Sequence, residues 1–367
     1  MRSKNQVLAS GMCSIATVVC IASEVNAQWT VRNFHPSGYS GSVASASDGA
    51  TLVGAAFLGS SEYAILWNAS DSSTVELGPE GSSASWVGGI DGGLQIGYAR
   101  FGTAARAGVW SGTAASWVDL HPAGTTNSYA VAGDGGRQVG HASVGDLRHA
   151  SLWSGTASSW VDLQPTGFRS SSAEDISGSQ QVGWVEPESG APLASIWTGT
   201  AASWVNLNPT GALFSRAWGT DGSQQVGSAF VDGMQRASLW SGSAASWVDL
   251  SPLGVTDSVA RAVFGSQQAG AVGLDGYSRA SVWSGTASSW VDLHSLLSSE
   301  FLSSEATDIY SDGINTYVTG FGFNLSTGQN EALMWIQPIP APGAAALLAL
   351  AGLARERRRR GDHRTGR

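Results

Sequence analysis

Lysine and cysteine are almost missing from this chain of 367 residues, and the few that occur lie near the N-terminus. The single lysine is Lys4, so the rest of the chain offers neither a phosphate-loop lysine nor a Schiff-base lysine. The two cysteines are Cys13 and Cys20, within a segment that we expect to be removed. The mature chain would then contain no disulfide, no cysteine nucleophile and no thiolate metal site.

The motifs of common enzyme classes are missing as well. The chain has no His-Glu-x-x-His, no Gly-x-Ser-x-Gly and no Gly-x-Gly-x-x-Gly at a strand-to-helix turn. Between Gln28 and Gln337 there are ten arginines, no lysine and 25 acidic residues, which gives a net charge of −15. Such a surface repels phosphate backbones and argues against nucleic acid as a partner. We therefore assign no catalytic residue, no cofactor and no metal ligand from the sequence.

The first 27 residues have the pattern of a secretory signal peptide. Arg2 and Lys4 form a basic start, and the stretch from Val7 to Ile21 is mostly apolar. Val25 and Ala27 place small residues at the −3 and −1 positions of a cleavage site. We expect signal peptidase to remove residues 1–27 and the chain to be exported.

Residues 338–367 combine three prolines, a twelve-residue apolar run from Gly343 to Ala354 and an arginine cluster. As a helix the run would rise about 18 Å, less than a hydrocarbon core of about 30 Å, so it predicts a marginal membrane anchor. This order resembles the PEP-CTERM sorting signal of exported bacterial proteins, with Pro340-Ala341-Pro342 in place of the name-giving Pro-Glu-Pro. The resemblance implies transient anchoring and processing by an exosortase-type enzyme at the cell surface. An ordinary tail anchor is the alternative.

Between these segments one unit is repeated seven times. Its marker is a tryptophan that recurs every 43 or 44 residues, with a last interval of 52, at Trp67, Trp110, Trp153, Trp197, Trp240, Trp283 and Trp335. In five units a second tryptophan follows after a small polar linker, which is typical of a hairpin. Asp134-Gly135 and its counterparts predict another tight turn. The third unit would thus hold four strands, at 128–133, 137–142, 149–153 and 160–163.

Four short strands in about 43 residues, without helical periodicity, predict one blade of a β-propeller. Prolines at the same spacing follow each fourth strand, and Pro36 places residues 31–34 as a fourth strand ahead of any complete unit. The last unit ends at Trp335 and lacks its own fourth strand. We therefore expect residues 28–337 to form an all-β, seven-bladed propeller whose last blade is closed by the N-terminal strand. The alternative is a β-solenoid, which needs no complementary half-units.

The unit resembles the HAF-type extracellular repeat of bacterial secreted proteins. The shared elements, quoted from the third unit, are Ser128, Ala130, Val139-Gly140, His149-Ala150, Trp153 and Asp162-Leu163. Ser151 stands where the family favours phenylalanine. The resemblance spans residues 28–337 and implies an exported, propeller-like protein with no assigned activity. It transfers no catalytic residues to this chain.

Residues that break the repeat are better functional candidates than residues that follow it. Three tryptophans outside the regular pairs could stack on sugars, with buried packing as the alternative: Trp86, Trp184 and Trp218. Four acidic residues gather in one unit and could serve glycoside hydrolysis, with a solvated acidic edge as the alternative: Glu174, Asp175, Glu186 and Glu188. A weaker metal or acid–base set in another unit consists of His141, Asp146 and His149.

One acidic position follows the repeat instead. It is occupied by Asp119, Asp162, Asp249 and Asp292, with Asn33 and Asn206 as equivalents. Because asparagine replaces aspartate there, we expect hydrogen bonding at a turn or strand end, with metal ligation as the alternative.

These observations lead to three hypotheses of function. The first is a non-enzymatic, surface-displayed propeller that binds envelope or extracellular-matrix material such as polysaccharide. The second is a propeller glycosidase or lyase that uses the pattern-breaking carboxylates. The third is a purely structural component of the matrix.

Overall fold

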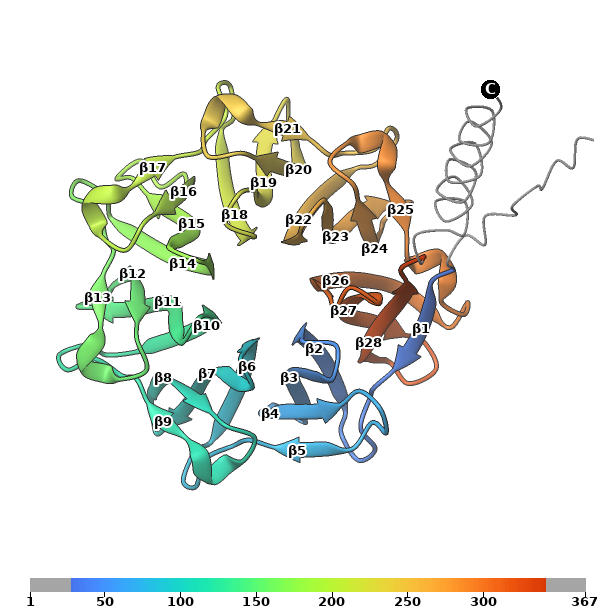
Figure 1. The fold of residues 1–367 in the computed structure, drawn as a ribbon, viewed down its shortest axis with the longest axis horizontal. Coiled ribbons are helices and arrows are strands. Elements are labelled where there is room, and N and C mark those ends of the chain that lie inside the picture. The colour runs from blue at the N-terminus through green and yellow to red at the C-terminus, as the bar shows by residue number, and fades with distance from the viewer. Residues whose placement is uncertain (1–27, 341–367) are drawn as a thin grey trace, which may run out of the picture. The chain divides into compact units, whose positions relative to one another are not determined.

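The computed structural model describes residues 28–340, which form a ring of seven β-sheets around a central axis (Figure 1). Twenty-eight strands make seven four-stranded antiparallel sheets, so the predicted seven-bladed propeller is confirmed. The predicted signal peptide and the apolar run from Gly343 to Ala354 lie outside the described residues. Within residues 28–340, no helix is long and apolar enough to cross a membrane.

The blades are numbered here in chain order. Blade 1 contains β2 (Gly41–Ser47), β3 (Thr51–Leu58), β4 (Ser61–Asn68) and β5 (Thr74–Glu76), and blade 2 contains β6 (Ala84–Asp91), β7 (Leu94–Phe101), β8 (Ala104–Trp110) and β9 (Val118–Asp119). Blade 3 contains β10 (Ser128–Asp134), β11 (Arg137–Val144), β12 (Leu147–Trp153) and β13 (Val161–Asp162), and blade 4 contains β14 (Ser170–Ser177), β15 (Gln180–Glu186), β16 (Leu193–Trp197) and β17 (Val205–Asn206).

The remaining blades follow the same order. Blade 5 contains β18 (Phe214–Thr220), β19 (Gln225–Val231), β20 (Met234–Trp240) and β21 (Val248–Asp249), and blade 6 contains β22 (Asp257–Phe264), β23 (Gln267–Leu274), β24 (Tyr277–Trp283) and β25 (Val291–Asp292). Blade 7 contains β26 (Phe301–Ser311), β27 (Asn315–Asn324) and β28 (Gln329–Pro338), and is completed by β1 (Thr30–Asn33). Single 3-10 turns are η1 (Ala114–Ser116), η2 (Ala157–Ser159), η3 (Ala201–Ser203), η4 (Ala244–Ser246), η5 (Ala287–Ser289) and η6 (His294–Leu296).

In each blade the first strand lies nearest the axis and the fourth lies at the rim (Figure 1). The turns between first and second strands define one face of the ring, which we call the turn face. The loops that connect successive blades define the opposite loop face. Gly135 and Gly136 adopt φ angles of 59° and 78° in the turn between β10 and β11, so the Asp-Gly signal marks a tight turn as predicted.

A repeated glycine lets the two innermost strands approach closely. A Cβ atom on Gly140 would lie 1.9 Å from the carbonyl oxygen of Tyr129, so no larger residue fits without a backbone shift. Gly140 pairs with Ala130, next to a β-bulge in β10. The same pairing occurs in all seven blades, at Gly54, Gly97, Gly140, Gly183, Gly227, Gly270 and Gly320. Gly320 lies further from the turn than its counterparts, because β26 and β27 are longer than the equivalent strands of the other blades.

Each blade is hydrogen-bonded to the preceding one through a buried serine of its first strand. The Ser128 Oγ atom accepts the backbone N–H of Ala107 in blade 2 at 2.9 Å, and Ser171 accepts that of Ala150 at 2.8 Å. All seven interfaces carry this bond, through Ser42, Ser85, Ser128, Ser171, Ser215, Ser258 and Ser304. The serine of the Ser-x-Ala pattern therefore satisfies a buried N–H that an apolar residue would leave unpaired.

The seven repeated tryptophans are the largest fully buried side chains of the ring. Each is fully buried, and their indole rings fill the space between the outer strands of adjacent blades. The second tryptophan of a pair is half-buried, and the Trp160 Nε1 atom donates to the Ser151 Oγ atom at 2.9 Å. The repeated tryptophans are therefore packing residues, as their fixed register indicated.

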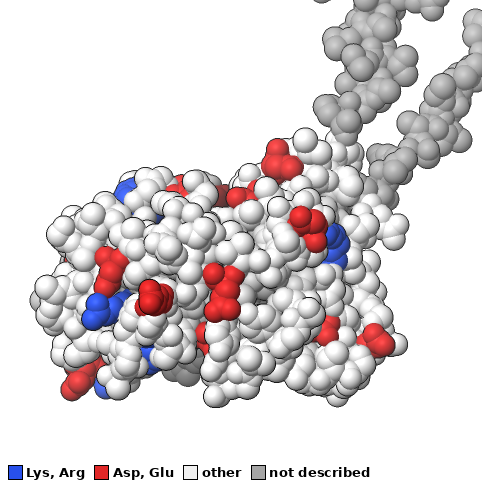
Figure 2. Space-filling model, turned by 90° about the horizontal axis from the view of Figure 1, so that it is seen from below, with Lys and Arg blue, Asp and Glu red and all other residues white. Residues whose placement is uncertain are grey.

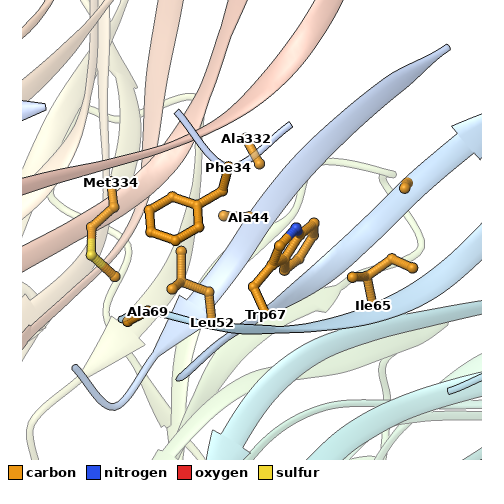
Figure 3. Packing of buried hydrophobic residues seen from close by; sticks show 9 residues of the cluster. Phe34, Ala44, Leu52, Ile65, Trp67, Ala69, Ala332 and Met334 are labelled. Carbon is orange, nitrogen blue, oxygen red and sulfur yellow. The ribbon is translucent and has the colours of Figure 1, made fainter. Parts of the chain in front are cut away.

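The ring is closed by the N-terminal strand, as predicted. β1 pairs antiparallel with β28, with Val31 opposite Trp335 and Asn33 opposite Leu333. Phe34 follows β1, is 2% exposed, and packs in one cluster with Leu52 of blade 1 and Met334 of blade 7 (Figure 3). A single aromatic side chain thus joins both sides of the closing interface.

Candidate functional site

The axis of the ring is an open channel lined by the β-bulges of the first strands. In each first strand one residue has no partner in the neighbouring strand, as Val131 does between Ala130 and Ala132. Two cavities of about 410 and 270 Å³, on the loop-face and turn-face sides, share all seven of these residues in their linings. We call them the axial ring: Ser45, Gly88, Val131, Glu174, Trp218, Arg261 and Thr307.

The axial ring carries a different residue in every blade, whereas its surroundings repeat. The preceding residue is alanine in six blades and Val87 in the other, and the cross-strand partner is glycine in all seven. A bulge leaves its extra residue free of the ladder, so the side chain can vary without disturbing the blade. The repeated residues build the scaffold, and the varied ones line the channel.

Aromatic side chains line the loop-face cavity. Trp86 and Trp218 come from blades 2 and 5 and both contribute to its wall, together with Phe321. An ion pair of 3.0 Å between Arg261 and Glu305 adds hydrogen-bonding groups at the wall. Aromatic faces beside polar groups suit a ligand with apolar ring faces and hydroxyl edges.

Trp184, the third of the pattern-breaking tryptophans, lies beside this cavity but is only 8% exposed. Its Nε1 atom donates to the Glu174 Oε1 atom at 2.9 Å. The guanidinium carbons of Arg148 and Arg216 lie 5.8 and 5.5 Å from its ring centroid. The ring therefore supports two guanidinium groups, and a sugar would meet those groups before the indole.

Three carboxyl groups reach the channel with perturbed acidity. Burial raises the pKa of Glu174, while hydrogen bonds from Ser172 and Trp184 oppose the shift. Burial also raises the pKa of Asp175 to about 7 and that of Asp308 to about 6. The negative charges of Asp308 and Asp134 add to the shift at Asp175. Burial makes the charged form of all three groups costly, and it brings the pKa values of Asp175 and Asp308 close to neutral pH.

Asp175 and Asp308 also connect blades on the turn-face side. The Asp175 carboxylate accepts the backbone N–H groups of Ile176 and, across the blade interface, of Thr220, both at 2.8 Å. Asp308 accepts the N–H of Ser47 at 3.1 Å across the interface between blades 7 and 1. Both residues directly follow the axial-ring residue of their blade.

The structure separates the acidic candidates. Glu174 and Asp175 line the channel, whereas Glu186 lies 3.9 Å from Arg169 at the end of β15. Glu188 is exposed in the following loop. The last two are thus away from the lining, and the structure does not bring the four carboxylates together.

The histidine candidates are not brought together either. The His149 Nδ1 atom lies 2.8 Å from an Asp162 oxygen, and His141 lies 3.3 Å from the Ser172 Oγ atom. Burial lowers the pKa of His141 to about 3, so its ring is neutral. No cluster of three metal-ligating side chains occurs within residues 28–340.

The repeated acidic position has the predicted hydrogen-bonding role. One oxygen of Asp249 accepts the backbone N–H of Ser251 at 2.8 Å, and the other binds Arg236 at 2.7 Å. Asn206 accepts the equivalent N–H of Asn208 at 2.8 Å. The side chain thus caps the turn that follows each fourth strand.

The sequence patterns did not single out several residues that lie at the channel or beside it. Asp308 occupies the same place as Asp175, two residues after the alanine that pairs with the glycine, and aligning the units would have revealed it. The longer interval in the last unit hides this match. Arg216 and Glu305 share the place just before that alanine, where the residue changes from blade to blade.

Comparisons with solved structures find propellers of other proteins. A puromycin hydrolase matches with a TM-score of 0.56 and 13% identity, covering 80% of this chain and 53% of that one. The acylaminoacyl peptidase of Pyrococcus horikoshii matches with a TM-score of 0.55 and 11% identity, covering 84% and 54%. The β-propeller domain of the Trilobed protease from Pyrococcus furiosus matches with a TM-score of 0.52 and 7% identity, covering 83% and 97%.

These matches show the fold alone, because identity is 7–13%. The chain spans about half the length of the two whole enzymes but nearly all of the isolated propeller domain. No protein-family model matches the sequence. No curated protein matches it either.

Proposed function

We propose that this protein is an exported, surface-displayed propeller that binds envelope or matrix polysaccharide in its axial channel without transforming it. The observation that carries the proposal is the lining of the loop-face cavity, where Trp86 and Trp218 stand beside the Arg261–Glu305 ion pair. Aromatic rings and paired polar groups match the alternating apolar faces and hydroxyl edges of sugars. Both tryptophans depart from the repeat, so the scaffold does not require them.

A glycan array with the purified full chain tests the proposal. We expect binding to be weakened in Trp86→Ala and Trp218→Ala variants and retained in Leu253→Ala, which alters a fully exposed side chain in the loop between β21 and β22 that lines neither cavity. Stacking of a sugar on an aromatic ring contributes on the order of 1 kcal/mol, so each variant should weaken binding several-fold. Absence of binding by the folded protein would leave the purely structural matrix component as the better hypothesis.

Export and display rest on the two end segments. In this proposal signal peptidase releases the chain at Gln28, and an exosortase-type enzyme removes the tail near Pro342 after transient anchoring. Intact-mass measurement of protein extracted from the cell surface tests both steps. A species that starts at Gln28 and lacks the arginine cluster is expected. A species that keeps Arg357 to Arg360 would indicate a plain membrane anchor instead.

A glycosidase or lyase is the second candidate, and the raised pKa values of Glu174, Asp175 and Asp308 favour it. A carboxyl group protonated near neutral pH can act as a general acid towards a glycosidic oxygen. Release of reducing ends from polysaccharide, lost in Asp175→Asn and Glu174→Gln, would replace the binding proposal with this one. Binding without product release would reject it.

A further inference from the structure

Three arginines of the ring differ from the others in the contacts of their guanidinium groups. Seven of the ten arginines in residues 28–340 form such contacts: Arg32, Arg106, Arg137, Arg169, Arg236, Arg261 and Arg279. The guanidinium groups of Arg100, Arg148 and Arg216 form no hydrogen bond and no close ion pair with the described residues, and the carboxyl groups that influence them electrostatically are Glu62 and Glu174. In a ring with a net charge of −15, unpaired guanidinium groups require an explanation.

Arg148 and Arg216 are held on aromatic rings instead of carboxylates. Arg148 lies over Trp184, and Arg216 lies over both Trp184 and Trp218, at 5.5 and 5.9 Å from the two centroids. We call these four residues the arginine–tryptophan ladder. Stacking on a ring orients a guanidinium group but leaves its N–H donors free for other partners.

The protein uses only the Trp184 indole N–H of the ladder, which donates to Glu174. The Arg216 Nε and Trp218 Nε1 atoms are buried and have no hydrogen-bond partner among the described residues. Buried atoms of this kind also occur in other arginines and tryptophans of the ring, so the donors open to a ligand are the terminal N–H groups of Arg148 and Arg216, which form no hydrogen bond with the described residues. Trp218 lines both cavities, so the ladder adjoins the channel through this residue.

The local charge is positive. The acidic group beside the ladder is Glu174, which interacts electrostatically with both Arg148 and Arg216. Its Oε1 atom already accepts the Trp184 indole N–H. One carboxyl group therefore faces two guanidinium groups, and the ladder retains capacity for a further negative charge.

We propose that the arginine–tryptophan ladder binds the carboxylate of a uronic acid residue, so that the ligand is an acidic polysaccharide. This inference rests on the proposed function and specifies its ligand. Guanidinium groups form two parallel hydrogen bonds to a carboxylate, and the neighbouring Trp218 ring offers an apolar face to the sugar. The attraction is local, because charges more than about 10 Å away are screened at 0.1 M salt. The acidic surface elsewhere therefore does not prevent it.

The experiment compares two hexasaccharides that differ only at C6. β-1,4-linked mannuronic acid carries carboxylates, and β-1,4-linked mannose carries hydroxymethyl groups. Calorimetric titration of the purified full chain should show about 10- to 100-fold tighter binding of the acidic ligand, since hydrogen bonds between charged groups have this strength. Arg216→Gln and the exposed Arg148→Gln should reduce that preference for the acidic ligand.

Arg100→Gln is the matched control, because it removes an unpaired arginine of blade 2 that is not part of the ladder. Its preference for the acidic ligand should equal that of the unmodified protein. If mannohexaose binds as tightly as the acidic ligand, the uronic acid assignment is wrong while the proposed function stands. If Arg100→Gln weakens acidic binding as much as Arg216→Gln does, the effect is general charge and the ladder is not the site. If neither hexasaccharide binds although the glycan array shows bound polysaccharide, the uronic acid assignment is wrong. If the array shows no bound glycan either, the proposed function fails as well.

Discussion

At the scale of single residues, this protein combines strict repetition with variation at one point of each unit. The glycine opposite the bulge is fixed by contact, since the Gly140 position has no space for a Cβ atom. The bulge residue follows the alanine or valine that pairs with this glycine and has no cross-strand partner itself. A different residue type stands at this position in each of the seven blades. Lack of space therefore explains why the glycine is repeated. The bulge residues are not constrained in this way, so the channel lining can differ between blades.

Gly140→Ala tests the steric part of this argument. The added methyl group would collide with the Tyr129 carbonyl oxygen, and relief requires separating β10 from β11. Overpacking of this kind costs about 1–3 kcal/mol, so the melting temperature should fall clearly. Gly41→Ala is the control, because its added Cβ would meet its nearest atoms at an ordinary 3.5 Å. Equal stability of the two variants would contradict the close approach.

Asp175 and Asp308 should make the stability of the ring depend on pH. Their pKa values of about 7 and 6 lie above the ordinary 3.8, so the folded protein binds protons more tightly than the unfolded chain. Their stabilising contribution is complete below about pH 4 and is lost as pH rises through 6 and 7. We expect the melting temperature to fall over this range, and to fall less in Asp175→Asn with Asp308→Asn. Parallel pH profiles of the two proteins would show that these groups ionise normally.

At the scale of elements, the turn between first and second strands has a defined backbone. Gly135 has a φ of 59°, which a β-branched residue adopts only with strain. Asp134→Ala combined with Gly135→Val should therefore lower stability by about 1–3 kcal/mol. Thermal unfolding measures this, and glycan binding should persist because the turn lies away from the loop-face cavity. An unchanged melting temperature would mean that the turn tolerates a different geometry.

The strands could be predicted from the sequence because the pattern of each strand recurs in the repeated units. Residues 149–153 were expected as a third strand and are part of β12. Residues 31–34 were expected as the closing strand, which the structure places at Thr30–Asn33 with Phe34 directly after it. The fourth strand was predicted one residue too long at each end, because Trp160 is the C-cap of η2 and Leu163 follows β13. The four strands of a blade are local in sequence, so spacing alone reveals them.

The channel could be predicted only in part. Trp218 and Glu174 were noticed because they break the repeat, but no pattern shows that a bulge turns them towards the axis. Arg148, Trp184 and Arg216 come from three consecutive blades, and their stacking depends on how the blades pack. Contacts between blades follow from the curvature of the ring, which periodicity does not encode.

At the scale of the whole molecule, the ring has one interface that differs from the rest. Six blades form from consecutive strands, whereas blade 7 needs β1, whose residues lie some 300 positions before their partners in β28. The outer face of the ring shows scattered charged side chains, most of them acidic (Figure 2). If β1 were removed, the edge of β28 would be exposed together with the apolar residues Leu333 and Trp335. The scattered surface charges would not prevent this edge from pairing with another molecule.

Deleting residues 28–36 should therefore open the ring. It removes every hydrogen bond between β1 and β28, the bond from the Phe34 N–H to the Ala332 oxygen at 2.8 Å, and the buried Phe34 side chain. Burial of that ring alone contributes about 1.5–3 kcal/mol. The truncated protein should melt at a much lower temperature and self-associate through the free β28 edge, which light scattering detects.

A milder variant separates closure from simple loss of core. Ser42→Ala leaves β1 in place but removes the acceptor of the Ala332 N–H at the interface of blades 7 and 1. Ser128→Ala removes the equivalent acceptor of Ala107 between two internal blades. If the closing interface is the weakest link of the ring, the first variant unfolds at the lower temperature and associates, while the second is only destabilised. If both variants unfold at the same temperature and neither associates, the interface between blades 7 and 1 is as stable as the internal ones. The seven interfaces would then open together.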